Sequence, residues 1–210
     1  MNPEELLQRA ERSRDLRRWG YRLLCGIDEV GRGALAGPVA AGAVVLDREL
    51  EVPGVDDSKR LTPLQRRRLA PLIRASAVAA AVGYATPREI DRMGIVEATR
   101  QAMHRALRRL GVRPDHLILD AFPLPGTDLP QIARPKGDHL YAEVAAASIL
   151  AKVERDALME RIALEFPAYG WRSNKGYGAA DHLAAIASRG LTPWHRRSFC
   201  KNLAERTAEG

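Results

Sequence analysis

The sequence is poor in cysteine, in lysine and in long hydrophobic runs. Its two cysteines, Cys25 and Cys200, stand far apart, which excludes a disulfide framework and a cysteine-based zinc pattern. Charged residues interrupt even the alanine-rich stretches, so no run reaches the length of a membrane-spanning helix. No signal peptide is recognisable at the start of the chain. These absences predict a soluble cytoplasmic protein that does not associate with membranes.

What the sequence does have is basic charge. Its 210 residues include 33 Lys and Arg against 26 Asp and Glu, for a formal net charge of +7. The excess favours an anionic partner, and nucleic acid is the leading candidate, although charge balance bears on solubility and steering more than on function. A hydrophobic content of 46% is enough for a sizeable core in one domain, or in one domain with an appendage.

Hydrophobic periodicity and helix-capping residues predict an alternation of strands and helices. We expect strands at residues 23–28, 38–46, 77–85, 116–120 and 131–134, and helices at residues 2–19, 62–75, 87–93, 95–110, 141–164 and 181–189. The link 31–37 is short enough for a hairpin, so the first two strands should be antiparallel. The helix at 95–110 is long enough for a crossover, so the strand at 116–120 should lie parallel to the first.

Two adjacent acids, Asp28 and Glu29, end the first strand. Burying unpaired charge is costly, and neighbouring side chains on a strand point to opposite faces. The pair therefore predicts a strand that ends or bulges at this point, with a divalent cation to relieve the repulsion. The alternative is a solvated strand end followed by a glycine turn. Asp120 ends another strand, and carboxyl ends of neighbouring parallel strands share one edge, so Asp28 and Asp120 would meet there if the two strands are neighbours.

Several short motifs together resemble ribonuclease HII, the type 2 ribonuclease H family. They are Asp28-Glu29-Val30-Gly31-Arg32-Gly33, Asp57-Ser58-Lys59-Arg60-Leu61, Leu119-Asp120, Lys136-Gly137-Asp138, Ala146-Ala147-Ser148-Ile149-Leu150-Ala151-Lys152-Val153 with Arg155-Asp156, and Lys175-Gly176-Tyr177-Gly178. The resemblance spans about residues 22–182. Two departures are visible, since the family usually has Gly where this chain has Ala121 and His where it has Asn174.

The resemblance implies an α/β fold, with a ribonuclease H-like mixed five-stranded sheet flanked by helices and a small helical C-terminal part. We expect a peripheral N-terminal helix (1–20), a catalytic domain (21–165) and a C-terminal substrate-binding loop with a helical extension (166–210). It also implies a monomeric endonuclease that cleaves the RNA strand of RNA/DNA hybrids. It would also incise duplex DNA 5′ of single ribonucleotides, leaving 3′-hydroxyl and 5′-phosphate ends during ribonucleotide and primer removal.

By the same resemblance, four acids are the catalytic and metal-binding residues, namely Asp28, Glu29, Asp120 and Asp138. Asp28 is the candidate bridging ligand, and Asp156 competes with Asp138 for the fourth position. The ligands are all oxygen, which implies Mn²⁺ or Mg²⁺, and two such ions can carry out phosphodiester hydrolysis. Another ribonuclease H-like nuclease or a non-catalytic hybrid-binding module are the alternative functions.

The resemblance also implies a set of substrate-binding residues. Backbone groups of Gly31, Arg32 and Gly33 would contact the ribose 2′-hydroxyl, the group that distinguishes RNA from DNA. Tyr177 would pack on the sugar of the next deoxynucleotide. Lys59, Arg60 and Lys175 are candidate phosphate contacts. Ser148 and Lys152 share one helix face and either reach the strand backbone or line the core. We expect most of the remaining arginines to be solvated.

Overall fold

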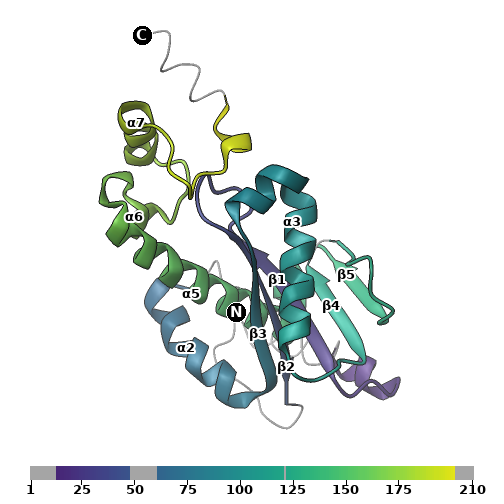
Figure 1. Cartoon of the computed structure of the whole chain (residues 1–210). Helices are drawn as coiled ribbons and strands as arrows, with labels where there is room; N and C mark the ends of the chain where they lie inside the picture. Colours follow the sequence, from purple (N-terminus) through teal and green to yellow (C-terminus); the bar gives the residue numbers. More distant parts are fainter. Residues whose placement is uncertain (1–12, 48–60, 121, 202–210) are drawn as a thin grey trace.

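Five strands form one mixed sheet at the centre of the molecule (Figure 1). The computed structural model describes residues 13–47, 61–120 and 122–201. The strands are β1 (Leu24–Val30), β2 (Val39–Leu46), β3 (Ala77–Ala85), β4 (His116–Asp120) and β5 (Gln131–Arg134), in the order β3-β2-β1-β4-β5. β2 pairs antiparallel with β1 and β3, while β4 pairs parallel with β1 and β5. This confirms the predicted fold class and the predicted neighbours of the first strand.

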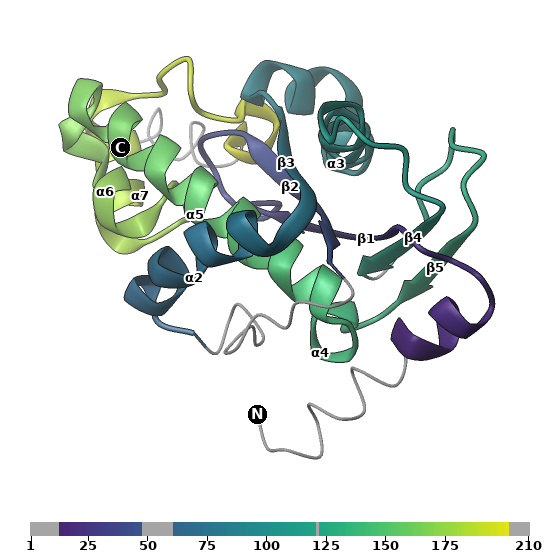
Figure 2. The same ribbon diagram turned by 90° about the horizontal axis from the view of Figure 1, so that it is seen from below.

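Helices cover both faces of this sheet (Figure 2). α3 (Pro87–Arg109) lies on one face, and α5 (Ala142–Glu165) with α2 (Pro63–Ser76) lies on the other. Short helices follow at α4 (Gly137–Leu140), α6 (Trp171–Asn174) and α7 (Ala180–Arg189), with 3₁₀ turns at Pro167–Tyr169 and Arg197–Phe199. None of the described helices has both the length and the apolar character that crossing a bilayer requires.

Local sequence signals set the beginnings of α2 and α3. Thr62 and Thr86 each cap a helix that begins with proline, and each forms a capping box with the residue three positions on, Gln65 or Glu89. Such boxes satisfy backbone N–H groups that have no partner within the helix. Gly94 has φ 79° inside α3 and divides it into two helical pieces. The two separately predicted helices at 87–93 and 95–110 are therefore confirmed.

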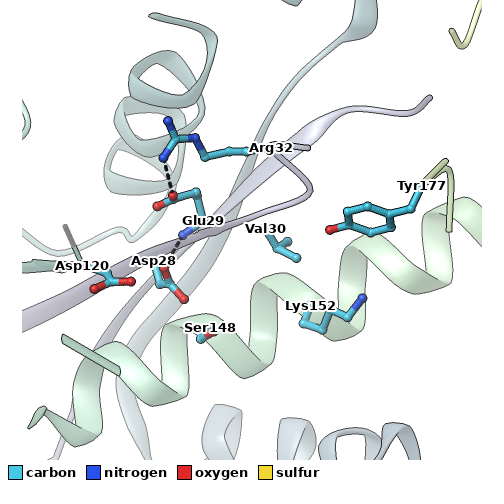
Figure 3. A pocket seen from close by; sticks show the side chains of 8 residues that line it. All are labelled: Asp28, Glu29, Val30, Arg32, Asp120, Ser148, Lys152 and Tyr177. Carbon is cyan, nitrogen blue, oxygen red and sulfur yellow. Dashed lines mark hydrogen bonds and ion pairs between the residues drawn. The ribbon is translucent and has the colours of Figure 1, made fainter. Parts of the chain in front are cut away.

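The position of the candidate site depends on how closely α5 packs on the sheet. A Cβ added to Gly26 of β1 would lie 2.1 Å from the backbone carbon of Glu143 in α5, so only glycine fits there. Buried Ala145, Ala146 and Ala147 form the adjoining surface of the helix. The contact lays α5 across β1 and β2 and brings Ser148 over the end of β1 (Figure 3).

The described part of the predicted N-terminal helix covers residues 13–18. Leu16 is buried against Leu24 and Ile118, and the Ser13 hydroxyl donates to Glu143 Oε2 at 2.9 Å. This segment is therefore packed against β1 and β4 of the sheet. The rest of the predicted helix lies outside the described residues.

The C-terminal part folds back onto the link between β1 and β2. Its aromatic side chains pack with Ala36 from that link and with Met159 from the end of α5. The N–H of Gly37 donates to Trp194 O at 2.8 Å, and the N–H of Arg196 donates to Leu35 O at 2.8 Å. These bonds pair the segment 194–196 with residues 35–37, directly after the 31–33 turn.

Candidate active site

A pocket of about 310 Å³ lies where β1 and β4 end beside α5 (Figure 3). It is lined by Asp28, Glu29, Val30, Arg32, Asp120, Ser148, Lys152 and Tyr177. Three of the four predicted metal-binding acids thus border one cavity, together with one residue of the 31–33 turn. Ser148 and Lys152, for which the sequence left two positions open, both face this cavity.

The two adjacent acids reach the pocket from opposite faces of the sheet. Ile27 packs with α3 residues, which puts Glu29 on the α3 face and Asp28 on the α5 face. The predicted bulge or strand end is wrong on the β2 side, because regular pairing continues to Val30–Ala40. On the other side, pairing with β4 stops at Ile27–Leu119. The sheet therefore opens between β1 and β4, and both acids border the opening.

Asp120 stands at the end of β4, next to Asp28 (Figure 3). Its Oδ1 accepts a hydrogen bond of 2.8 Å from the N–H of Gly137. Asp138 follows Gly137 in the chain, is 1% exposed and does not line the pocket. Asp156, the competing candidate, pairs with Lys152 Nζ at 2.8 Å one helical turn away. The residue before Asp138 thus contacts Asp120, whereas Asp156 forms an ion pair with Lys152; Asp138 as the fourth acid stays a prediction.

Burial dominates the electrostatics of the two strand acids. It raises the pKa of Asp28 to about 8, with the neighbouring Glu29 charge as the next cause, while a hydrogen bond from Ser148 acts in the opposite direction. Burial also raises the pKa of Glu29, against the lowering effect of Arg32, whose Nη1 lies 3.1 Å from Glu29 Oε1. The site therefore disfavours two bare carboxylates, and a bound cation would relieve this cost.

The donor set suits a hard divalent cation. Glu29 Oε2 is buried and accepts no hydrogen bond from the described residues, and the nearby acids offer only oxygen, as Mg²⁺ and Mn²⁺ prefer. In the part of the chain that the structure describes, no three Asp, Glu, His or Cys side chains stand close enough to hold an ion as they are. The acids therefore suit a divalent cation by the type and charge of their donor atoms.

The two glycines of the 31–33 turn differ in backbone conformation and in the space around them. Gly31 has φ +85°, and a Cβ there would lie 2.1 Å from Arg155 Nε. Gly33 has no such backbone conformation, and a Cβ there would meet no protein atom within 4 Å. The fold therefore requires glycine at 31 only. Between them, the Arg32 guanidinium pairs with Glu29 and lies 5.2 Å from the Phe122 ring centroid.

The other predicted substrate-binding residues differ in position. Tyr177 is partly exposed at the pocket rim, with Lys152 Nζ 6.0 Å and Arg155 Cζ 5.6 Å from its ring centroid. Lys175 does not line the pocket and pairs with Glu160 at 2.9 Å. Lys59 and Arg60 lie outside the described residues. The Tyr177 loop is therefore at the site, while Lys175 does not lie in the cavity.

One of the two departures from the family pattern can be described. Asn174 Nδ2 donates to Tyr169 O at 2.9 Å, and Asn174 Oδ1 accepts from the N–H of Gly176 at 2.9 Å. The amide thus bonds the backbone at Tyr169 and at Gly176, the residue before Tyr177. Ala121, the other departure, lies outside the described residues.

Two buried arginines were missed by sequence reasoning, which predicted mostly solvated arginines. Arg155 and Arg196 are both 0% exposed. Arg155 donates to the carbonyls of Pro38, Ala36 and Lys175, at 2.9, 3.2 and 3.0 Å. It therefore ties the β1–β2 link to the Tyr177 loop. No local pattern marks an arginine that will bond carbonyls more than one hundred positions away, as Arg155 does with Ala36 and Pro38.

A pair of buried histidines fixes the same loop from behind. Trp171 Nε1–H donates to His182 Nε2 at 2.9 Å, so His182 carries its proton on Nδ1 and donates to Tyr177 O at 2.8 Å. His195 Nδ1 accepts from the N–H of Thr192, so its Nε2–H points at His182 Nε2, 3.1 Å away. Both rings must be neutral for this network to form.

This network predicts acid-sensitive stability. Burial, with a contribution from His182, lowers the pKa of His195 from 6.5 to about 4. The unfolded chain therefore takes up this proton first, so the stabilisation is complete above pH 6.5 and is lost as the pH falls toward 4. We expect His195→Gln to reduce the loss of unfolding free energy between pH 7 and 4.5 by about 2 kcal/mol. Urea unfolding at several pH values measures this.

The matched control is His104→Gln, because His104 contacts Pro125 O in an exposed position. It should leave the pH profile of unfolding unchanged. An unchanged profile for His195→Gln as well would show that His195 is not held neutral.

The similarity of this chain to known proteins covers all the residues of the site. The family model described as "Ribonuclease HII" matches residues 25–202. "Ribonuclease HII" of Levilactobacillus brevis is 52% identical over 176 residues, which are 84% of this chain and 68% of that protein. The ribonuclease H2 structure from Pyrococcus horikoshii OT3 matches with a TM-score of 0.74 at 29% identity, over 89% of this chain and 99% of that chain. Bst-RNase HIII in complex with Mn²⁺ matches with a TM-score of 0.70 at 25% identity, over 92% and 73%.

Proposed function

The chain belongs to the ribonuclease HII family, and from this premise we propose that its pocket incises duplex DNA on the 5′ side of a single embedded ribonucleotide. Membership makes the protein an endoribonuclease, a hydrolase that acts on RNA/DNA hybrids. The proposal adds the single-ribonucleotide substrate, the dependence on divalent cations, and 3′-hydroxyl and 5′-phosphate products. Its main support is the convergence of Asp28, Glu29 and Asp120 on one pocket beside the 31–33 turn.

Asp28, Glu29, Asp120 and Asp138 would hold the cations. Two divalent ions in such a site activate a water molecule and stabilise the leaving oxygen of a phosphodiester. Asp28 lies between Glu29 and Asp120 (Figure 3), and burial and then the charges of these two acids raise its pKa, which supports it as the shared ligand. The Mn²⁺ complex of Bst-RNase HIII supports the choice of ion, with Mg²⁺ as the alternative.

The remaining lining residues would bind and orient the substrate. Ser148 bonds the Asp28 carboxylate and holds it toward the pocket. Lys152 and Arg32 place positive charge on the pocket lining, where a phosphate backbone would pass. The 31–33 turn exposes backbone at Gly33 without a side chain, which allows close approach of a sugar. The Tyr177 ring offers a flat surface for the neighbouring deoxyribose.

A substrate panel tests the proposal. Duplex DNA with one central ribonucleotide should yield a single product, cut on the 5′ side of that residue, with Mn²⁺ or Mg²⁺ and not with EDTA. The all-DNA duplex of the same sequence should stay intact, and an RNA/DNA hybrid should be cut at internal positions. Products that shorten from chain ends, or cleavage of all-DNA junctions, would indicate a different ribonuclease H-like nuclease.

A further inference from the structure

One buried guanidinium faces three backbone carbonyls around the 31–33 turn. Arg196 Nη2 donates to Gly31 O at 2.7 Å, Nη1 donates to Arg32 O at 2.7 Å, and Nε donates to Gly37 O at 2.9 Å. Arg196 is 0% exposed and is separated from the turn by more than 160 positions in the sequence. The C-terminal segment therefore reaches the turn through this side chain, while its backbone pairs with residues 35–37 just after the turn.

The planar shape of the guanidinium matters for this contact. Its donors have fixed relative directions, so three bonds to three carbonyls determine the orientation of the peptide planes. Arg155 packs against the Cα of Gly31 from another side. The turn is thus held by both buried arginines, and a lysine at 196 could not satisfy three separated carbonyls with the same geometry.

Fixing these carbonyls also fixes the N–H groups of the same peptides. The C=O of Gly31 belongs to the peptide of the Arg32 N–H, and the C=O of Arg32 belongs to that of the Gly33 N–H. In a trans peptide the two groups point in opposite directions, and the described chain has no cis peptide. Because the carbonyls point at buried Arg196, the two N–H groups point away from it.

These two N–H groups are available to a ligand. Among the described residues, neither one donates a backbone hydrogen bond within the protein. A cation bonded to the carbonyl side polarises the peptide and makes its N–H a stronger donor. Arg196 has no acidic hydrogen-bond partner among the described residues, so its charge acts on the turn itself.

We propose that Arg196 is a positioning residue for substrate selection, which holds the Gly31 and Arg32 carbonyls so that the N–H groups of Arg32 and Gly33 bind the acceptor oxygens of a ribonucleotide. The inference rests on the proposed function of the pocket. It assigns the C-terminal segment a role in telling ribose from deoxyribose without any contact to the substrate. It also explains why a charged side chain is buried where an apolar one would need no desolvation.

Equilibrium binding in EDTA, which prevents cleavage, tests the inference. The probes are a fluorescent DNA duplex with one central ribonucleotide and the all-DNA duplex of the same sequence. The wild type should prefer the first about tenfold, the size expected for one to two good hydrogen bonds. Arg196→Lys keeps the charge but not the three directions, and it should bring the ratio of the two dissociation constants to within about twofold of one. Affinity for the all-DNA duplex should not change.

Arg105→Lys is the matched control. Arg105 also donates to a backbone carbonyl, Tyr84 O, but it lies on α3 and does not line the pocket. Loss of stability alone would lower both affinities together, and would do so in either variant. A full ribonucleotide preference in Arg196→Lys would overturn the inference, whereas no preference in the wild type would contradict the proposed function instead.

A second measurement needs no variant. The backbone amide resonances of Arg32 and Gly33 in the wild-type protein should shift on addition of the ribonucleotide duplex and much less with the all-DNA duplex. Equal shifts with both duplexes, or none with either while binding is detected, would overturn the inference even if Arg196→Lys failed to fold.

Discussion

Replacing Asp28 by Asn should abolish measurable incision at an embedded ribonucleotide. Substitution of residues that only support metal ligands lowers metal affinity or activity about 10- to 100-fold. Loss of a shared ligand oxygen should therefore lower the incision rate at least about 1,000-fold. The amide has nearly the same shape as the carboxylate and can still accept a hydrogen bond from Ser148. Single-turnover cleavage with Mn²⁺ measures the effect. Incision within tenfold of the wild-type rate would exclude Asp28 as a catalytic ligand.

The same substitution should stabilise the metal-free protein. The pKa of Asp28 is 3.8 as a free side chain and about 8 in the folded protein, chiefly because of burial. Ionisation therefore favours the unfolded chain, so the stability present below pH 3.8 is lost as the pH rises through 8. Asn carries no charge, and at pH 7 with EDTA it should raise the unfolding free energy by up to about 4 kcal/mol.

A thermal or urea unfolding series measures this gain. Asp128→Asn is the control, since Asp128 forms an exposed pair with Arg113, and exposed pairs contribute little. The gain for Asp28→Asn should shrink as the pH is lowered toward 4. A variant that is less stable than the wild type at pH 7 would contradict the electrostatic account, whatever its activity.

Much of the fold could be predicted from the sequence because local signals agree with the final packing. The capping residue Thr62 and the apolar run at 116–120 mark their elements directly. β3 and β5 have the predicted bounds. The meeting of Asp28 and Asp120 followed from one topological rule, that parallel neighbours share their carboxyl edge.

The details of the site could not be predicted in this way. Asp28 and Glu29 border one cavity because β4 stops pairing with β1 at Ile27–Leu119. Where this pairing ends depends on both strands together, so the sequence around Asp28 does not determine it. Arg155 stands in a motif of the family resemblance, but nothing in the sequence predicts its burial, and Arg196 looks like any other arginine of a basic sequence. Their burial depends on carbonyls freed at the glycine-rich link 31–37, which meet the two side chains only after the C-terminal segment has packed on α5.

The two glycines of the 31–33 turn allow fold and function to be separated. Gly31→Ala adds the strain of a positive φ and a clash with Arg155, so it should lower the unfolding free energy by about 2–5 kcal/mol. Gly33→Ala adds a methyl group that meets no protein atom within 4 Å, so its unfolding free energy should stay within about 0.5 kcal/mol of the wild type.

Gly33→Ala should nevertheless lower incision at a single ribonucleotide by about 100-fold, because a displacement of about 1 Å at a reacting group has an effect of that size. The methyl group would stand where the sugar has to approach the N–H groups of the turn. Metal binding should be unaffected, because Gly33 bears no ligand, and Mn²⁺ titration of both proteins checks this. If Gly33→Ala cleaves like the wild type, the exposed backbone of the turn does not contact the ribose. Glycine at this position would then reflect neither the fold nor the substrate.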